Sequence, residues 1–195
     1  MPRPRLFLES DAVAAVLEVF WRDGYEGASV QALCEAAGVQ KGSLYAAFGD
    51  KRALFLRALA AYQATMLDAV RARLAGEAPA AERLARWLGG VVRGQCEAGE
   101  RRGCLVVNTA IELAPRDAEV AALVRAHDSA LEAVLREVVQ AGIADGSLRA
   151  GLDARQSARF LLTTLHGLAV GARAGHGRAW LDGGVTLALA ALRAP

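Results

Sequence analysis

Residues 29–48, SVQALCEAAGVQKGSLYAAF, decide the fold. Ser29 can cap the first turn of a helix, and Gly38 supplies the left-handed residue that ends one. Between them apolar side chains recur every three or four residues, which predicts a short amphipathic helix. A second short helix is predicted from Gln40 to Ala47. Two short helices joined by a glycine turn predict a helix-turn-helix, a motif that places its second helix in the major groove of DNA.

The flanking sequence predicts two helices that complete a helical head. The first runs from Asp11 to the region of Gly24, and a longer one runs from Asp50, which can cap it, to Leu74. Each has one apolar face that can pack against the helix-turn-helix. These faces consist of Val13, Val16, Leu17 and Phe20 in the first helix, and of Phe55, Leu59, Tyr62 and Met66 in the longer one.

The remaining sequence predicts only further helices. Apolar residues make up 54% of the 195 positions and only five are proline, which favours an all-α protein, here of about nine helices. We expect a three-helix DNA-binding domain in residues 1–57 and a larger helical domain in residues 58–195. The helices predicted beyond Leu74 are Ala80–Ala98, Cys104–Leu113, Arg116–Ala144, Ala154–Gly175 and Arg178–Arg193.

Charge alone does not indicate a nucleic-acid partner. The formal net charge is +2, and residues 1–57 carry seven basic and seven acidic side chains. The placement of lysine is more informative, because the chain has only two, Lys41 and Lys51, and both lie in or beside the predicted helix-turn-helix. Spacing therefore supports DNA binding more strongly than charge does.

The hydropathy of the sequence and its cysteines lead to expectations about the location of the protein and about metals. Residues 1–5 lack the apolar core of a signal peptide, and the longest nearly uncharged stretch, residues 160–172, is too short and polar to span a bilayer. We expect a soluble, cytoplasmic protein without a membrane partner. The chain has three cysteines, Cys34, Cys96 and Cys104, and their spacing is not that of a zinc site. Because an odd number cannot all pair within one chain, we expect free thiols. We also expect no metal and no cofactor.

The segment from Gly24 to Lys51 closely resembles the DNA-binding signature of the tetracycline-repressor (TetR/AcrR) family. The likeness covers about residues 10–60 and implies a homodimeric, ligand-responsive regulator, usually a repressor released from a palindromic operator by a small-molecule or electrophile inducer. It further implies that the later helices form a ligand chamber and that the last two helices form the dimer interface. The matching residues are Gly24, Tyr25, Ser29, Val30, Leu33, Ala36, Ala37, Gly38, Val39, Lys41, Gly42, Ser43, Leu44, Tyr45, Phe48 and Lys51.

The predicted contacts to double-stranded DNA cluster around the second short helix. Gly42 allows close approach of the backbone, and the side chains beside it can meet phosphates or base edges. Tyr45 is either a DNA contact or a half-buried core residue. Ala46 and Ala47 stand where many members of the family have larger polar or aromatic residues. The predicted DNA-binding residues are Arg3, Arg5, Ser29, Gln31, Gln40, Lys41, Gly42, Ser43, Tyr45 and Lys51.

The larger domain offers candidates for the ligand chamber. Each of them can instead be an ordinary core residue, because periodicity does not separate a core-facing position from a ligand-facing one. They are Trp87, Val91, Cys104, Val107, Asn108, Ile111, His127, Leu131, His166 and Trp180.

Cys104 is a candidate sensor thiol. It follows Arg101 and Arg102 and opens a predicted helix, so two guanidinium groups and the helix dipole would favour the reactive thiolate. Two alternatives to a regulator remain. One is an all-helical thiol enzyme using Cys104, although no histidine lies in a recognisable active-site motif, and we expect no enzyme. The other is an all-helical interaction module without DNA binding.

Overall fold

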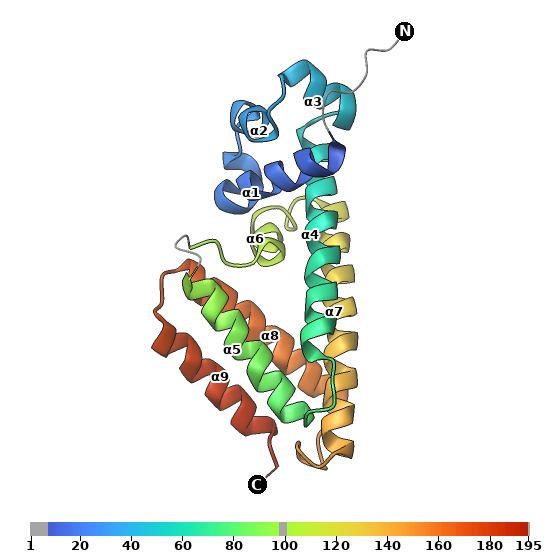
Figure 1. Ribbon diagram of the computed structural model, residues 1–195, viewed down its shortest axis with the longest axis vertical. Helices are drawn as coiled ribbons and strands as arrows, with labels where there is room; N and C mark the ends of the chain where they lie inside the picture. The colour runs from blue at the N-terminus through green and yellow to red at the C-terminus, as the bar shows by residue number, and fades with distance from the viewer. Residues whose placement is uncertain (1–7, 98–100, 195) are drawn as a thin grey trace.

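The computed structural model describes residues 8–97 and 101–194, so the predicted contacts Arg3 and Arg5 lie outside the described residues. Within these ranges the chain forms nine α-helices, which confirms the all-α prediction (Figure 1). The helices are α1 (Glu9–Gly27), α2 (Val30–Ala37), α3 (Lys41–Phe48), α4 (Lys51–Leu74), α5 (Ala80–Glu97), α6 (Leu105–Glu112), α7 (Ala118–Ala144), α8 (Ala154–Arg173) and α9 (Arg178–Leu192).

Helices α1, α2 and α3 form a head at one end of the molecule (Figure 1). The Ser29 hydroxyl accepts a hydrogen bond from the Ala32 amide at 3.0 Å, which satisfies a free N–H group at the start of α2. Gly38 ends α2 in the left-handed region with φ 65°. Leu33 and Leu44 are completely buried between the helices. The predicted helix-turn-helix is therefore present.

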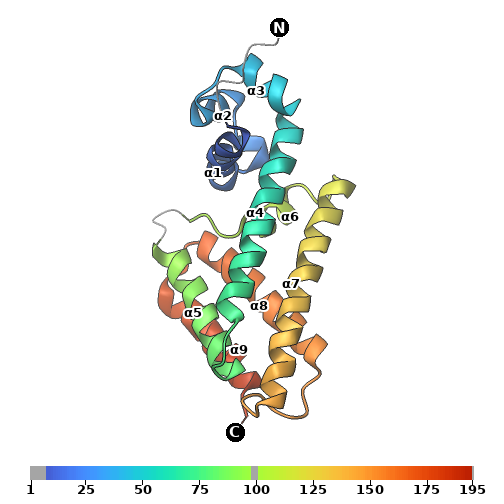
Figure 2. The same ribbon diagram turned by 45° about the vertical axis from the view of Figure 1, so that its right-hand side comes forward.

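Helix α4 connects the head to the body of the molecule (Figures 1 and 2). The Asp50 carboxylate caps it by accepting a hydrogen bond from the Ala53 amide at 2.7 Å. Near its start Phe55 is buried in the core of the head, and near its end Val70 is buried in the core of the body. The domain boundary that the sequence predicts between residues 57 and 58 falls within this continuous helix.

The body is a bundle in which α7 packs along α8 and α5 packs along α9. Its centre contains fully buried leucines such as Leu84, Leu135 and Leu161. Helix α6 lies between this bundle and the head (Figure 2). Its Leu105 and Val106 belong to the core of the head, so this short helix joins the two parts.

Several helix boundaries differ from the sequence predictions by one to three residues, and two of these differences have an identifiable reason. Helix α1 does not end at Gly24: it kinks there, with φ 77°, and continues to Gly27. Helix α7 begins at Ala118 rather than Arg116, because Asp117 is its N-cap and its carboxylate accepts hydrogen bonds from the first turn. No helix in the described part of the chain is long and apolar enough to cross a membrane.

Candidate functional site

Helix α3 lies at the outer end of the head (Figure 1), and one of its sides is polar and exposed to solvent. Leu44 and Phe48 are buried against the head, whereas Lys41, Gly42 and Ser43 are exposed. A Cβ atom added at Gly42 would meet nothing within 4 Å. Packing within the chain therefore does not require glycine at this position. Close approach of the α3 backbone to a binding partner would require it.

The neighbouring polar residues extend this surface. Gln40 is exposed at the N-cap of α3, and Gln31 is exposed on α2, where its amide donates a hydrogen bond to the Glu35 carboxylate at 2.9 Å. Tyr45 is half-buried, and its ring centroid lies 5.9 Å from the Lys41 ammonium. This position of Tyr45 suits both a DNA contact and a core role, so its role stays a prediction.

Lys51 begins α4 and is held by the end of α1. Its ammonium lies 4.7 Å from the centroid of the Tyr25 ring and donates a hydrogen bond to the Glu26 carbonyl oxygen at 3.5 Å. The position of Lys51 therefore depends on the conformation of residues 25–26, which lie in the last turn of α1.

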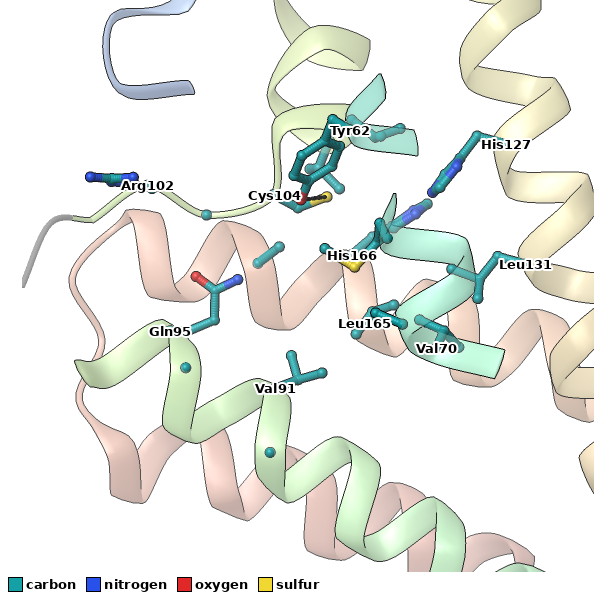
Figure 3. A pocket seen from close by; sticks show the side chains of 18 of the residues that line it. Tyr62, Val70, Val91, Gln95, Arg102, Cys104, His127, Leu131, Leu165 and His166 are labelled. Carbon is teal, nitrogen blue, oxygen red and sulfur yellow. Dashed lines mark hydrogen bonds between the residues drawn. The ribbon is translucent and has the colours of Figure 1, made fainter. Parts of the chain in front are cut away.

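A cavity of about 290 Å³ lies in the body (Figure 3). Helices α4, α5, α7 and α8 and the segment that leads into α6 contribute to its wall. Of the ten residues predicted for the ligand chamber, seven line this cavity: Trp87, Val91, Cys104, Val107, His127, Leu131 and His166.

The other three predicted chamber residues do not line this cavity. The Asn108 amide donates a hydrogen bond to the Arg102 carbonyl oxygen at 2.8 Å, which fixes the chain before α6. Ile111 is 66% exposed and Trp180 is 56% exposed. Ile111 and Trp180 therefore lie at the surface of the chain. Their apolar character alone had suggested the interior, and it does not distinguish a surface position from an interior one.

Two aromatic side chains that were not predicted from the sequence as chamber residues also line the cavity. Trp21 of α1 and Tyr62 of α4 line it, with ring centroids 4.9 Å apart in an edge-to-face arrangement. The Trp21 indole N–H donates a hydrogen bond to the Gly103 carbonyl oxygen at 3.1 Å. The one-turn spacing of Leu17 and Trp21 was an available signal of a second apolar stripe on α1. Met66, Leu165 and Arg102 are further wall residues that were not predicted.

Cys104 lies at the N-cap of α6 and faces Tyr62 (Figure 3). The Tyr62 hydroxyl donates a hydrogen bond to the Cys104 sulfur at 3.7 Å. Burial raises the pKa of Tyr62 well above its usual range, and the neighbouring Cys104 adds to this effect. Tyr62 therefore remains a protonated hydrogen-bond donor at neutral pH.

The two arginines before Cys104 do not form the expected pair of guanidinium groups around its sulfur. Arg102 forms an ion pair with Glu18 and lies 5.8 Å from the centroid of the Trp21 ring, directed away from Cys104 (Figure 3). The Arg101 guanidinium lies against Gly175, two residues beyond the end of α8. That part of the sequence argument for a thiolate is therefore wrong.

His127 of α7 and His166 of α8 lie in the wall of the cavity where these two helices meet it. Burial lowers the pKa of His127 below its usual 6.5, opposed by the charge of Asp128. The His127 side chain is only 8% exposed and has no hydrogen-bond partner among the described residues. The Nε2 atom of His166 lies 3.3 Å from Oδ1 of Asp128. The cavity therefore contains a neutral imidazole that is free to bond with a guest molecule.

These features define a DNA-binding transcriptional regulator. The exposed helix α3, which would enter the major groove and is called the reading helix below, lies on a head that one long helix connects to a body with an internal cavity. Residues 12–58 match the model of the bacterial regulatory proteins of the tetR family, and residues 80–182 match that of the tetracyclin repressor-like C-terminal domain. The chain belongs to the TetR family of transcriptional regulators.

Several known regulators are similar to the chain. The transcriptional repressor ComR of Escherichia coli K12 is 27% identical over 174 residues, which cover 89% of this chain and 83% of ComR. A cysteine mutant of the TetR family regulator CifR, solved with 26-base-pair operator DNA, is 38% identical with a TM-score of 0.86, covering 97% of this chain and 99% of CifR. Reduced E. coli NemR shares the fold, with a TM-score of 0.83 at 19% identity. The match covers 95% of this chain and 97% of NemR.

Proposed function

We propose that this regulator is a repressor that binds a two-fold symmetric DNA operator as a homodimer. The observation that carries the proposal is the exposed polar side of α3, with Lys41, Gly42 and Ser43 at its start. Relatives support the direction of regulation, since ComR, BdcR of E. coli and DhaR of a Mycobacterium are transcriptional repressors. DNA binding in turn supports a cytoplasmic location.

The exposed apolar side chains of α8 and α9 support a dimer interface through the last two helices. Phe160 and Val170 on α8 are 43% and 46% exposed, and Leu187 on α9 is 74% exposed. Large apolar side chains left exposed on two helices that pack against each other indicate a surface that a partner covers. A second copy is the partner that a two-fold operator requires, because each half-site needs one reading head.

Selection of bound duplexes from a random DNA pool tests this proposal. We expect enrichment of a palindrome whose half-sites lie in major grooves about 34–36 Å apart, or a multiple of this distance. One experiment thus reports DNA binding, dimer symmetry and spacing. Failure to enrich any sequence would instead support the interaction module without DNA binding.

We further infer that the cavity of the body binds a small inducer, a largely apolar and uncharged molecule with one hydrogen-bonding group. Aromatic and aliphatic side chains make up most of the wall, and its two most buried polar groups, His127 and Tyr62, favour their neutral forms. Binding would stabilise a conformation in which α4 has moved and the two reading helices no longer match successive major grooves.

Cys104 offers a second route of induction, by covalent modification. It lines the cavity beside Tyr62, whose hydroxyl can stabilise a developing negative charge on the sulfur. Iodoacetamide is a suitable probe, since the S–C bond forms as iodide leaves and the thiol proton passes to solvent. Cys34 and Cys96 react in parallel, so Cys104→Ser is the matched control. We expect alkylation to release DNA from the parent protein only. Unchanged affinity after stoichiometric modification of Cys104 would exclude the sensor role.

We infer no enzymatic activity. Among the described residues Cys104 has Tyr62 rather than a histidine as its hydrogen-bond partner, and a protonated phenol does not serve as the general base that a nucleophilic thiol requires. Turnover abolished by Cys104→Ala would contradict this inference.

A further inference from the structure

The kink in α1 creates a binding site for a carboxylate. At Gly24 the backbone leaves the helical region, so the amides that follow have no acceptor within the preceding turn. Glu112 of α6 supplies one: its Oε2 accepts a hydrogen bond from the Tyr25 amide at 3.0 Å, and its Oε1 accepts one from the Glu26 amide at 2.8 Å. A side chain of the body thus caps the last turn of a helix of the head.

The sequence at the kink is adapted to this contact. Gly24 has φ 77°, a conformation that side chains rarely adopt. A Cβ atom added there would lie 2.8 Å from Oε2 of Glu112. Glycine therefore serves two purposes at this position, because it permits the kink and leaves room for the carboxylate.

Helix α6 also forms part of the chamber. Cys104, at its N-cap, and Val107, in its first turn, line the cavity, whereas Glu112 is its last residue. The helix is eight residues long, which corresponds to about 12 Å. A guest that displaces the start of α6 would therefore displace the carboxylate at its other end.

The capped turn in turn holds a predicted DNA contact. The Glu26 carbonyl oxygen accepts the hydrogen bond from Lys51, and the Tyr25 ring lies below the Lys51 ammonium. The Tyr25 ring itself packs edge-on against Phe55, with centroids 5.1 Å apart. Loss of the cap would therefore affect the two groups that position the Lys51 side chain.

We propose that Glu112 is a positioning residue that couples the chamber to DNA: it holds the last turn of α1, and through it Lys51, in the DNA-binding arrangement. This inference rests on the proposed function. Through this residue, ligand binding can weaken DNA binding within one subunit, in addition to any change in the distance between the two heads. Displacement of α6 alone releases Lys51, and α4 does not have to move.

Two substitutions of Glu112 test the cap with the duplex enriched from the random pool. Glu112→Ala removes both hydrogen bonds and weakens DNA binding about tenfold, whereas Glu112→Gln keeps one acceptor and weakens it less. Glu132→Gln is the matched control, because Glu132 is also a carboxylate of the body but its partners among the described residues are Arg155 and Arg159 of α8. Hydrogen exchange of the Tyr25 and Glu26 amides reports the cap directly, without DNA, and accelerates in both Glu112 variants.

Double mutants test the two links. Lys51→Ala and Val107→Trp, which fills part of the cavity in place of a guest, each weaken DNA binding in the parent but add little in the Glu112→Ala background. Parent-like affinity of Glu112→Ala overturns the inference. So does full additivity with either second substitution, which shows that the effects are independent. A parent protein that binds no DNA refutes the proposed function instead, so the two failures are distinguishable.

Discussion

His127 illustrates how a single buried residue makes stability depend on pH. Burial lowers its pKa below 6.5, so below that pH the unfolded chain binds a proton that the folded chain excludes. Stability contributed by the neutral imidazole is therefore present above pH 6.5 and is lost as the pH falls toward the folded-state pKa.

We predict that His127→Leu reduces the loss of unfolding free energy between about pH 7.5 and about pH 5, as measured by urea denaturation. His176→Gln is the control, because His176 is exposed and stacks on Trp180 at 4.1 Å. An unchanged pH profile in His127→Leu would show that this histidine does not supply the dependence.

Lys51 is predicted to contact a DNA phosphate, and its contribution can be measured as a salt dependence. We expect Lys51→Ala to reduce the slope of log affinity against log salt concentration by about 1, because one fewer counterion is released. Arg71→Ala removes the same charge from the far end of α4, where Arg71 pairs with Asp68, and should leave the slope unchanged. Equal slopes for Lys51→Ala and the parent would exclude the phosphate contact.

The chamber shows what sequence can reveal about individual residues. Periodicity identified wall residues on the body helices, such as Val91 and Leu131, because the apolar faces of those helices turn inward. It could not identify Trp21 of α1 or Tyr62 of α4, since whether these residues reach the cavity depends on how the head and the body pack together. It placed Trp180 in the wall because a partly exposed apolar residue and one that faces the interior look alike in sequence.

At the scale of helices, caps and glycines predicted most boundaries correctly, and α1 shows where such local rules stop. The helix was expected to end near Gly24, whereas it kinks there and continues to Gly27. The continuation to Gly27 depends on Glu112, which is 87 residues beyond Tyr25 in the chain, so no local signal could reveal it.

The kink itself gives a prediction about stability. Gly24→Ala must adopt φ 77° and place a Cβ atom 2.8 Å from Glu112, so we expect a loss of about 1–3 kcal/mol in unfolding free energy. Gly94→Ala is the matched control, because Gly94 lies within α5 with open space around it and no positive φ. That change should be neutral or stabilise by up to about 1 kcal/mol. Equal unfolding free energies of Gly24→Ala and Gly94→Ala would show that a side chain at residue 24 does not strain the kink.

At the scale of the molecule, the head is fixed to the body by polar contacts as well as by α4. Arg52 of α4 pairs with Asp117 at 2.9 Å and with Glu119 at the start of α7, and these carboxylates raise the pKa of the guanidinium. The Trp21 indole and the Glu112 carboxylate add two further connections. A rigid attachment suits a dimeric regulator, because the distance between two heads is meaningful only if each head has a fixed position on its body.

The proposed dimer gives the last prediction. Leu187 is 74% exposed on α9, and a carboxylate placed there would be buried without a partner in an interface through the last two helices. We expect Leu187→Glu to halve the mass measured by sedimentation. A monomer would bind an isolated half-site as before but would lose most of the affinity for the palindrome, since its two heads would no longer bind as one unit.

Leu8→Glu is the control for the oligomeric state, because Leu8 is 68% exposed next to α1, at the opposite end of the molecule from the body. It should leave the sedimenting mass unchanged. A Leu187→Glu protein that remains dimeric would place the interface elsewhere. In that case the exposed apolar residues of α8 and α9 would need another partner, and the spacing of the two heads would have to be set by a different surface.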